Sequence, residues 1–123
     1  MFEPCDCGSG ATYITCCGRL HAGAPAPDAE ALMRSRYSAF RRADVAYLLK
    51  SWAAETRPPS LSLDPQQEWT GLKIHHHRLT GPDTAIVKFT AKWRSGQRTG
   101  RLTETSRFRR DGAGWVYVDG GAG

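Results

Sequence analysis

The sequence predicts an α+β protein in which a small zinc-binding module precedes a helical hairpin packed on a curved antiparallel sheet. Three observations support this prediction. All four cysteines of the 123-residue chain lie between positions 5 and 17. Apolar residues then recur at helical spacing as far as Trp52. From Trp69 onward they alternate with polar residues, as in strands, and helices that precede strands favour α+β architecture.

The chain has the size of one main domain, so we expect an α+β unit over residues 28–119 and a module over residues 1–22. Residues 22–27, Ala-Gly-Ala-Pro-Ala-Pro, suit neither a helix nor a central strand and are predicted to be a linker. No stretch approaches the run of about 18 apolar residues that a membrane span needs. The first residues lack the basic and apolar segments of a secretory signal. We therefore expect a cytoplasmic protein, in which reduced cysteines favour metal binding over disulfides.

The cysteines form two close pairs, Cys5 with Cys7 and Cys16 with Cys17. Zn²⁺ prefers four soft ligands in a tetrahedron, at about 2.3 Å from each sulfur, and two local pairs joined by a turn can supply them. Disulfides are the alternative, but a bond between adjacent cysteines requires strained geometry. A catalytic zinc would keep one position open for water. We expect a closed structural site, and the spacing leaves the fourth ligand as either Cys17 or His21, one helical turn further on.

Two helices are predicted at the start of the α+β domain. Asp28 is a favourable N-cap for the first, over residues 29–40, whose apolar side consists of Leu32, Met33, Tyr37 and Phe40. Asp44 caps the second, whose apolar side consists of Tyr47, Leu48 and Trp52. The second helix should end before Arg57-Pro58-Pro59, because the residue before a proline disfavours the helical conformation. The two helices are expected to form a hairpin.

A meander of about four strands is predicted after the helices. The clearest strand covers residues 85–94, in which apolar and polar side chains alternate. Flanking runs at residues 69–79, 100–110 and 115–118 are separated by the sequences Gly-Pro-Asp, Ser-Gly and Asp-Gly. These sequences are typical of turns between antiparallel strands.

Three consecutive histidines, His75, His76 and His77, lie in the first predicted strand. Regular alternation would place His75 and His77 on one face and His76 on the other. Two histidines on one face can chelate a metal ion, but no carboxylate or third histidine follows at a matching spacing. We favour a structural role for them.

The cysteine segment resembles a known zinc motif. The pattern Cys5-x-Cys7-Gly-Ser-Gly-x-x-Tyr-x-x-Cys16-Cys17-Gly is similar to the SEC-C motif, best known from the C-terminal tail of the preprotein translocase ATPase SecA. In that motif the ligands are three cysteines and a final Cys or His. The resemblance implies the ligand set Cys5, Cys7, Cys16 and Cys17, and it favours Cys17 over His21.

Nearly the whole chain resembles the YchJ-like family of small bacterial proteins. The resemblance is carried by residues 29–40, then Tyr47-Leu48-Leu49, and then Trp52 before Thr56-Arg57-Pro58. That family joins a SEC-C motif to a domain similar to nuclear transport factor 2. The resemblance therefore implies a cone-shaped α+β fold.

Folds similar to nuclear transport factor 2 often enclose a pocket between their helices and the concave face of the sheet. Strand alternation places Glu104 among apolar residues on that face, where a carboxylate must be paired or neutral. One interpretation is an ion pair with Arg34 or Arg36 that fixes how helix and sheet pack. The other is a general base or ligand anchor in a pocket, with these further residues: Arg34, Tyr37, Trp52 and Trp93.

Basic residues of neighbouring predicted strands form a second candidate surface: Lys88, Lys92, Arg94, Arg101, Arg107 and Arg109. The chain carries a formal charge of +5, and such a patch would suit RNA or the ribosome. Charge on an outer sheet face more commonly prevents edge pairing, and no aromatic residues interleave here to stack bases.

These features predict a cytoplasmic adaptor whose structural zinc module contacts a protein or ribosomal partner. No Ser/His/Asp arrangement, phosphate-binding glycine loop or pair of carboxylates is evident, so we expect a binding protein rather than an enzyme. Two alternatives stay open. One is a small-ligand receptor or enzyme that uses the pocket around Glu104, and the other is nucleic-acid binding through the basic face.

Overall fold

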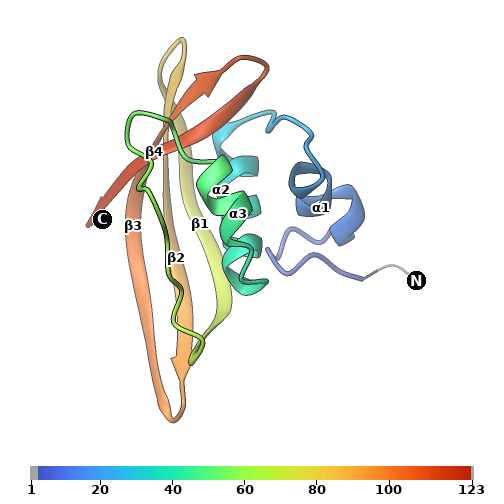
Figure 1. Cartoon of the computed structure of the whole chain (residues 1–123), viewed down its shortest axis with the longest axis vertical. Coiled ribbons are helices and arrows are strands. Elements are labelled where there is room, and N and C mark those ends of the chain that lie inside the picture. Colours follow the sequence, from blue (N-terminus) through green and yellow to red (C-terminus); the bar gives the residue numbers. More distant parts are fainter. Residues whose placement is uncertain (1–2, 123) are drawn as a thin grey trace.

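The computed structural model describes residues 3–122 of the chain. Residues 1 and 2, which belong to the predicted module, and residue 123 lie outside the described residues. The elements are, in chain order, the 3-10 turn η1 (Tyr13–Thr15), α1 (Cys17–His21), α2 (Ala29–Arg41), α3 (Val45–Lys50), β1 (Gln67–Gly81), β2 (Thr84–Ser95), β3 (Arg98–Asp111) and β4 (Gly114–Ala122). The predicted α+β fold is confirmed (Figure 1).

The strands form one antiparallel sheet in the order β1-β2-β3-β4, so each strand pairs with its neighbour in the sequence. This is the predicted meander. Gly96 and Gly112 have φ angles of 63° and 60° at the turns before β3 and β4. Only a residue without Cβ takes up that conformation without strain, which explains the glycines in both turn sequences.

Both helices of the hairpin begin where the sequence predicts. The Asp28 side chain accepts a hydrogen bond from the Ala31 backbone N–H at 2.7 Å, and Asp44 does the same for Tyr47 at 3.1 Å. The second helix is shorter than expected, because α3 ends at Lys50 and leaves Trp52 outside it. Trp52 instead forms an isolated bridge with Tyr117 of β4, in which the Ala53 N–H donates to the Tyr117 carbonyl and the Tyr117 N–H donates to the Ser51 carbonyl.

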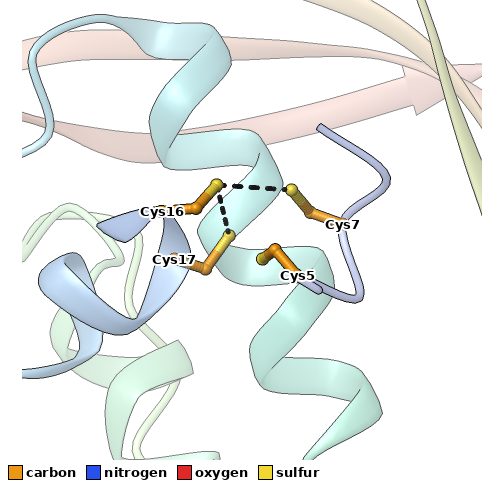
Figure 2. Close-up of side chains that lie close together, drawn as sticks. All are labelled: Cys5, Cys7, Cys16 and Cys17. Atoms are coloured by element: carbon orange, nitrogen blue, oxygen red, sulfur yellow. Dashed lines mark hydrogen bonds between the residues drawn. The ribbon is translucent and has the colours of Figure 1, made fainter. Parts of the chain in front are cut away.

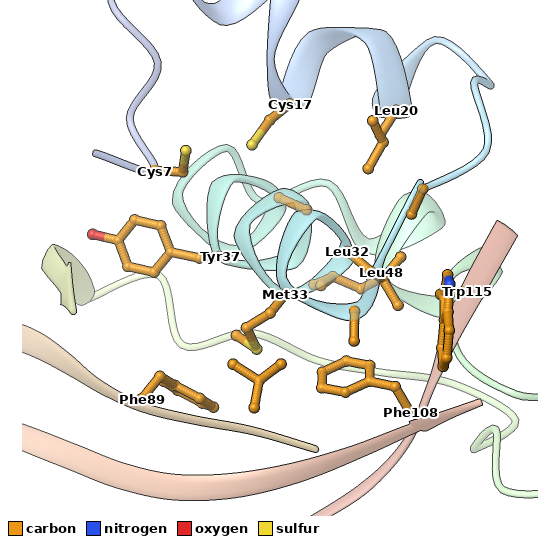
Figure 3. Close-up of a cluster of buried hydrophobic side chains, with 14 of the residues drawn as sticks. Cys7, Cys17, Leu20, Leu32, Met33, Tyr37, Leu48, Phe89, Phe108 and Trp115 are labelled. Carbon is orange, nitrogen blue, oxygen red and sulfur yellow. The ribbon is translucent and has the colours of Figure 1, made fainter. Parts of the chain in front are cut away.

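The molecule has three layers (Figure 1). α2 and α3 cover one face of the sheet, and the N-terminal segment with α1 lies on the side of α2 away from the sheet. Figure 3 shows the same order among the buried side chains, with Cys7, Cys17 and Leu20 above α2 and with Phe89 and Phe108 of the sheet below it. α2 is therefore the central element, and each of its two sides faces a different part of the molecule.

The three histidines of β1 do not alternate as predicted. A bulge between Ile74 and His76 interrupts the regular pairing with β2. His76 pairs with Lys88 and His77 with Val87, whereas His75 lies in the bulge and its Nε2 is 2.7 Å from the Thr90 hydroxyl oxygen. Because the bulge inserts an extra residue, His77 lies on the core face, whereas His75 and His76 lie on the outer face. The prediction that His75 and His77 share a face is wrong.

None of the helices within residues 3–122 combines the length and the apolar composition required to cross a bilayer.

Candidate functional site

The four cysteine sulfurs converge between the N-terminal turn and the start of α1 (Figure 2). All four Sγ atoms lie within 4.8 Å of one another. The Sγ atoms of Cys7 and Cys16 are 3.7 Å apart, and those of Cys16 and Cys17 are 4.0 Å apart. A tetrahedron with metal–sulfur bonds of about 2.3 Å has edges of about 3.8 Å. The geometry therefore fits one tetrahedral metal ion bound by four thiolates.

Local backbone structure brings the two cysteine pairs together. Residues 5–11 form a turn closed by a hydrogen bond from the Cys5 N–H to the Ala11 carbonyl at 2.9 Å. Within it, Gly8 and Gly10 have φ angles of 80° and 89°, which L-residues with a side chain rarely adopt. The Gly-Ser-Gly sequence between the pairs thus allows the chain to reverse over a few residues.

Burial and altered thiol pKa values favour metal binding at the four cysteines. Cys5, Cys7 and Cys17 are buried, and the Ser9 hydroxyl lies 3.1 Å from the sulfur of Cys16. Side-chain hydrogen bonding with Cys17 holds the pKa of Cys7 well below that of an ordinary thiol, whereas the same interaction raises the pKa of Cys17. Four thiols this close cannot all lose their protons without repulsion between the thiolates. A bound cation replaces the protons and offsets that repulsion.

His21, the alternative fourth ligand, is committed to other contacts. Its Nε2 lies 2.8 Å from the Ser35 carbonyl and its Nδ1 lies 2.7 Å from the Tyr13 hydroxyl. Because a carbonyl only accepts, Nε2 carries the proton and Nδ1 accepts from the tyrosine. The ring also meets that of Tyr47 edge-on, with centroids 4.6 Å apart. His21 therefore fastens α1 to α2 and α3, and neither ring nitrogen retains a free lone pair for a metal.

Polar contacts fix the cysteine module on the outer side of α2. Asp6, between two of the cysteines, accepts a hydrogen bond from the Ser38 hydroxyl at 2.5 Å and lies 3.2 Å from the Arg42 guanidinium. Arg34 donates to the Cys7 carbonyl at 2.9 Å. Each of these groups meets a partner of opposite charge or complementary hydrogen-bonding type.

A cavity of about 190 Å³ lies on the other side of α2, between this helix and the sheet. Its walls combine residues of α2, the sheet and the loop after α3: Met33, Arg36, Tyr37, Phe40, Trp52, Leu61, Trp69, Phe89, Ala91, Leu102, Glu104, Ser106 and Tyr117. Most of these side chains are apolar or aromatic. The polar groups are few, which is the usual composition of a site for a small molecule.

The charged residues of the cavity are Arg36 and Glu104. Arg36 is 3% exposed, and its guanidinium lies over the rings of Trp52 and Tyr117, 5.0 Å and 4.3 Å from their centroids. Burial lowers the pKa of Arg36 to about 10. Burial also raises the pKa of Glu104, and the nearby Ser106 hydroxyl offsets the rise only in part. Arg36 thus keeps its charge at neutral pH, while burial makes ionisation of Glu104 less favourable than it is in water.

Two residues predicted for this pocket lie elsewhere. Arg34 points to the cysteine module and pairs with Glu30 at 3.0 Å, because its position on α2 is on the side away from the cavity. Trp93 packs over Gly100 of β3 and does not line the cavity. The interpretation that Glu104 pairs with Arg34 or Arg36 is also not observed among residues 3–122, where Arg36 donates to the carbonyl of α3 and a serine hydroxyl.

Sequence reasoning missed Arg36 and Tyr117 as cavity residues. The signal for Arg36 was present, because it follows Met33 by three positions and precedes Phe40 by four and so shares their apolar helical face. Tyr117 offered no comparable signal. Its place in the cavity depends on how β4 pairs with β3, where the register shifts between Arg107 and Phe108.

The predicted basic patch is partly neutralised. Three of its members are ion-paired: Arg94 with Glu68, Arg107 with Asp119 and Arg109 with Glu55. The other three, Lys88, Lys92 and Arg101, make no ion pair within the part of the chain that the structure describes. Lys92 and Arg101 lie directly opposite each other on β2 and β3.

Comparison with known proteins gives consistent matches in sequence and structure. The family model for the middle NTF2-like domain of YchJ matches residues 28–120. A UPF0225 protein of Xanthomonas oryzae pv. oryzae is 53% identical over 120 residues, which are 95% of this chain and 93% of that protein. A UPF0225 protein of Streptomyces coelicolor is 50% identical over 119 residues, with 95% and 94% covered. These matches confirm the resemblance inferred from the sequence.

Two solved structures share the fold over most of the chain. The solution structure of a SEC-C motif containing protein from Rhodopseudomonas palustris aligns with a TM-score of 0.84 at 29% identity, over 100% of this chain and 99% of that chain. The crystal structure of a SEC-C motif containing protein from Psychrobacter arcticus gives a TM-score of 0.78 at 25% identity, over 94% and 79% of the two chains. The cysteine cluster and the SEC-C likeness together indicate a metal-binding module.

Proposed function

We propose, from the premise that this chain belongs to the YchJ-like UPF0225 family, that it is a cytoplasmic adaptor whose cysteine module holds a structural zinc ion and presents a rigid surface to a protein or ribosomal partner. The observation that carries the proposal is the closed set of four thiols within 4.8 Å. Zn²⁺ is the metal that four cysteines in a tetrahedron most commonly bind in proteins.

The ligand set supports a structural rather than a catalytic role for the metal. A catalytic zinc usually has three protein ligands and an open position for water or substrate. Here four sulfurs are available, three of the cysteines are buried, and the module packs on α2 through Asp6 and His21. The ion would hold Cys5, Cys7, Cys16 and Cys17 together and fold the turn around them.

The surface that the module offers to a partner centres on Ile14. This side chain is 69% exposed on η1, between the two cysteine pairs, and has the exposed Thr15 beside it. An isolated exposed apolar residue is common on protein surfaces and by itself needs no explanation. The position of Ile14 is nevertheless unusual, because a metal-bound cluster would fix the backbone on both sides of it and so lower the entropy cost of binding.

The test combines native mass spectrometry with affinity capture from bacterial cytosol. We expect one zinc ion per chain, and we expect captured protein or ribosomal components to be released on chelation. Ile14→Asp should abolish capture while the zinc remains bound. Leu79→Asp is the matched control, because Leu79 is also exposed, at 62%, but lies on β1 in the sheet.

Two results would contradict the proposal. A chain that binds no zinc when purified under reducing conditions would remove its structural basis. Equal loss of captured partners in Ile14→Asp and Leu79→Asp would show that capture depends on general surface apolarity and not on the module.

A further inference from the structure

We propose that the cavity between α2 and the sheet is a binding site for a small molecule that joins an apolar body to a carboxylate. This site is separate from the cysteine module, which lies on the opposite side of α2 (Figure 3). Four features of the cavity support the inference: its unpartnered donors, its net charge, the arrangement of its polar groups, and its size and walls.

Within residues 3–122, two buried polar atoms of the cavity walls have no hydrogen-bond partner: Nε1 of Trp52 and Oγ of Ser106. Ser106 is 1% exposed, so its hydroxyl is shielded from bulk solvent. An unsatisfied buried polar group is destabilising, and native proteins leave few of them. The indole N–H can only donate, so the missing partner of Trp52 is a hydrogen-bond acceptor.

Among residues 3–122, the buried guanidinium of Arg36 forms no ion pair with a carboxylate. Arg36 interacts with the Leu48 carbonyl at 2.8 Å, the Ser51 hydroxyl at 2.7 Å and two aromatic faces, none of which bears a negative charge. Burial raises the pKa of Glu104, so its ionised form is less stable in the cavity than in water. A buried cation without an anion is costly, so an anionic ligand is electrostatically favoured in this cavity.

The polar groups gather at one end of the cavity. A Cβ built on Gly120 would lie 2.8 Å from Oε2 of Glu104, 3.1 Å from Oγ of Ser106 and 3.2 Å from the Tyr117 hydroxyl oxygen. Three oxygens thus approach one backbone position of β4. A side chain at Gly120 would collide with them, so the glycine allows these oxygens to gather close to the backbone at this end of the cavity. In their protonated forms all three groups can donate to the same acceptor.

The remaining walls of the cavity indicate the chemistry of the part of the ligand away from its carboxylate. They are apolar or aromatic and include Met33, Phe40, Trp69, Phe89 and Leu102. The volume of about 190 Å³ is an order of magnitude more than a single water requires. One arginine matches a single negative charge, whereas a phosphate usually gathers several cationic or backbone donors. A compact apolar carboxylate is the ligand class that satisfies the charge, the donors and the walls together.

The experiment compares phenylacetate with its neutral analogue phenylacetamide, using the full-length zinc-loaded protein. Binding is followed by NMR through the indole N–H signal of Trp52, which is assigned by its disappearance in Trp52→Phe. We expect phenylacetate to shift this signal and to bind about tenfold more tightly than the amide, because the charged acceptor gains the larger hydrogen-bond energy. Benzoate and hexanoate, each with its amide, test the same rule with other apolar bodies.

Three variants locate the binding site. Leu102→Trp should block it, because Leu102 is 39% exposed and lines the cavity wall. Ser106→Ala should weaken carboxylate binding several-fold without closing the cavity. Lys92→Gln is the control for net charge, since Lys92 is exposed on the outer face of the sheet, and it should leave binding unchanged.

The proposal is overturned by any of three results. The first is that no carboxylate of the set shifts the Trp52 signal, which would mean that the cavity holds water only. The second is that acids and amides bind equally well. The third is that Leu102→Trp leaves binding intact, which would place the ligand elsewhere.

Discussion

The two sides of α2 differ in the partners that they offer to a buried or half-buried arginine. Arg34 and Arg36 are two positions apart on this helix. Arg34 faces the cysteine module, where it meets the Glu30 carboxylate at 3.0 Å and the Cys7 carbonyl at 2.9 Å. Arg36 faces the cavity, where it contacts aromatic rings and neutral oxygens and forms no ion pair within residues 3–122.

The difference separates a side of α2 on which the polar groups are hydrogen-bonded from a side on which some buried polar atoms lack a partner among residues 3–122. On the module side, Asp6 and His21 have hydrogen-bond partners, and the four thiols need only one ion. On the cavity side, Trp52 and Ser106 each bury an unpartnered polar atom. Satisfied buried groups stabilise a structure, whereas unsatisfied ones retain capacity for binding. Each prediction below tests one consequence of this distinction.

The largest effect is expected from removing a sulfur ligand. Cys7→Ser should abolish zinc binding and unfold residues 5–21, with a local loss on the order of 10 kcal/mol at neutral pH. Hydrogen exchange should show full loss of protection in this segment. The pairing of β2 (Thr84–Ser95) with β3 should persist, because its hydrogen bonds do not involve the module.

Thr15→Ala is the control for the cysteine substitution. Thr15 lies in the same module, is exposed, and bonds only to Thr12. It should retain zinc and normal exchange protection. If Cys7→Ser keeps one tightly bound zinc and unchanged protection of residues 5–21, the four-thiol site is wrong.

The second prediction distinguishes Cys17 as a metal ligand from His21 as a residue that only stabilises the packing of α1. His21→Asn should keep one zinc per chain and lower the free energy of unfolding by about 1–3 kcal/mol, because the Ser35 carbonyl and the Tyr13 hydroxyl lose their partner. Cys17→Ser should instead lose the metal. The measurements are zinc content by mass spectrometry and denaturant unfolding. Loss of zinc in His21→Asn would make the imidazole a ligand and contradict the hydrogen bonds seen here.

The sequence was informative where structure depends on near neighbours. The metal site is built within a short segment, so cysteine spacing predicted which sulfurs meet. Hydrophobic periodicity and the N-cap residues Asp28 and Asp44 likewise predicted the helices and the meander.

Features that depend on distant pairing were predicted poorly. Trp52 was assigned to a helix, but it pairs with Tyr117 in β4, which no local pattern could indicate. The bulge beside His76 moved His77 to the core face, because one extra residue reverses the alternation that follows it. Arg34 and Glu104 were assigned to one pocket. In the structure Glu104 lines the cavity, whereas Arg34 lies on the other side of α2, since periodicity alone did not decide which side of this helix would meet the sheet.

The third prediction concerns Glu104 and the pH dependence of stability. The folded-state pKa of Glu104 lies above its ordinary value because of burial, with Ser106 as a smaller opposing influence. The stability that its proton contributes is complete below the unfolded-state pKa of about 4.3 and is lost as the pH rises through the folded-state pKa. Glu104→Gln should therefore be more stable than wild type at pH 8 and similar to it at pH 4.

The measurement for Glu104 is the free energy of unfolding at both pH values. Glu68→Gln serves as the control, because Glu68 is exposed and ion-paired with Arg94 and so should show no gain at pH 8. The other titratable groups of the cavity, Arg36, Tyr37 and Tyr117, keep their charge state between these pH values, because the pKa of Arg36 is about 10 and burial raises the pKa values of both tyrosines. Equal stability of Glu104→Gln and wild type at pH 8 would mean that the ionised carboxylate is well solvated, and the cavity would lose part of its net positive charge.

The smallest effect is expected on the outer face of the sheet, where the same distinction applies to Arg101 and Arg107. The Arg107 guanidinium is already paired with Asp119 at 2.5 Å, whereas Arg101 lies opposite Lys92. Of these two arginines, Arg101 is the one whose charge remains uncompensated and available to a phosphate. Arg101→Glu should lower the affinity for single-stranded RNA and reduce the salt slope by about 0.7, while Arg107→Glu should change both much less. Equal effects of the two reversals, measured by fluorescence anisotropy at several salt concentrations, would show that ion pairing does not decide which surface charges are available to a partner.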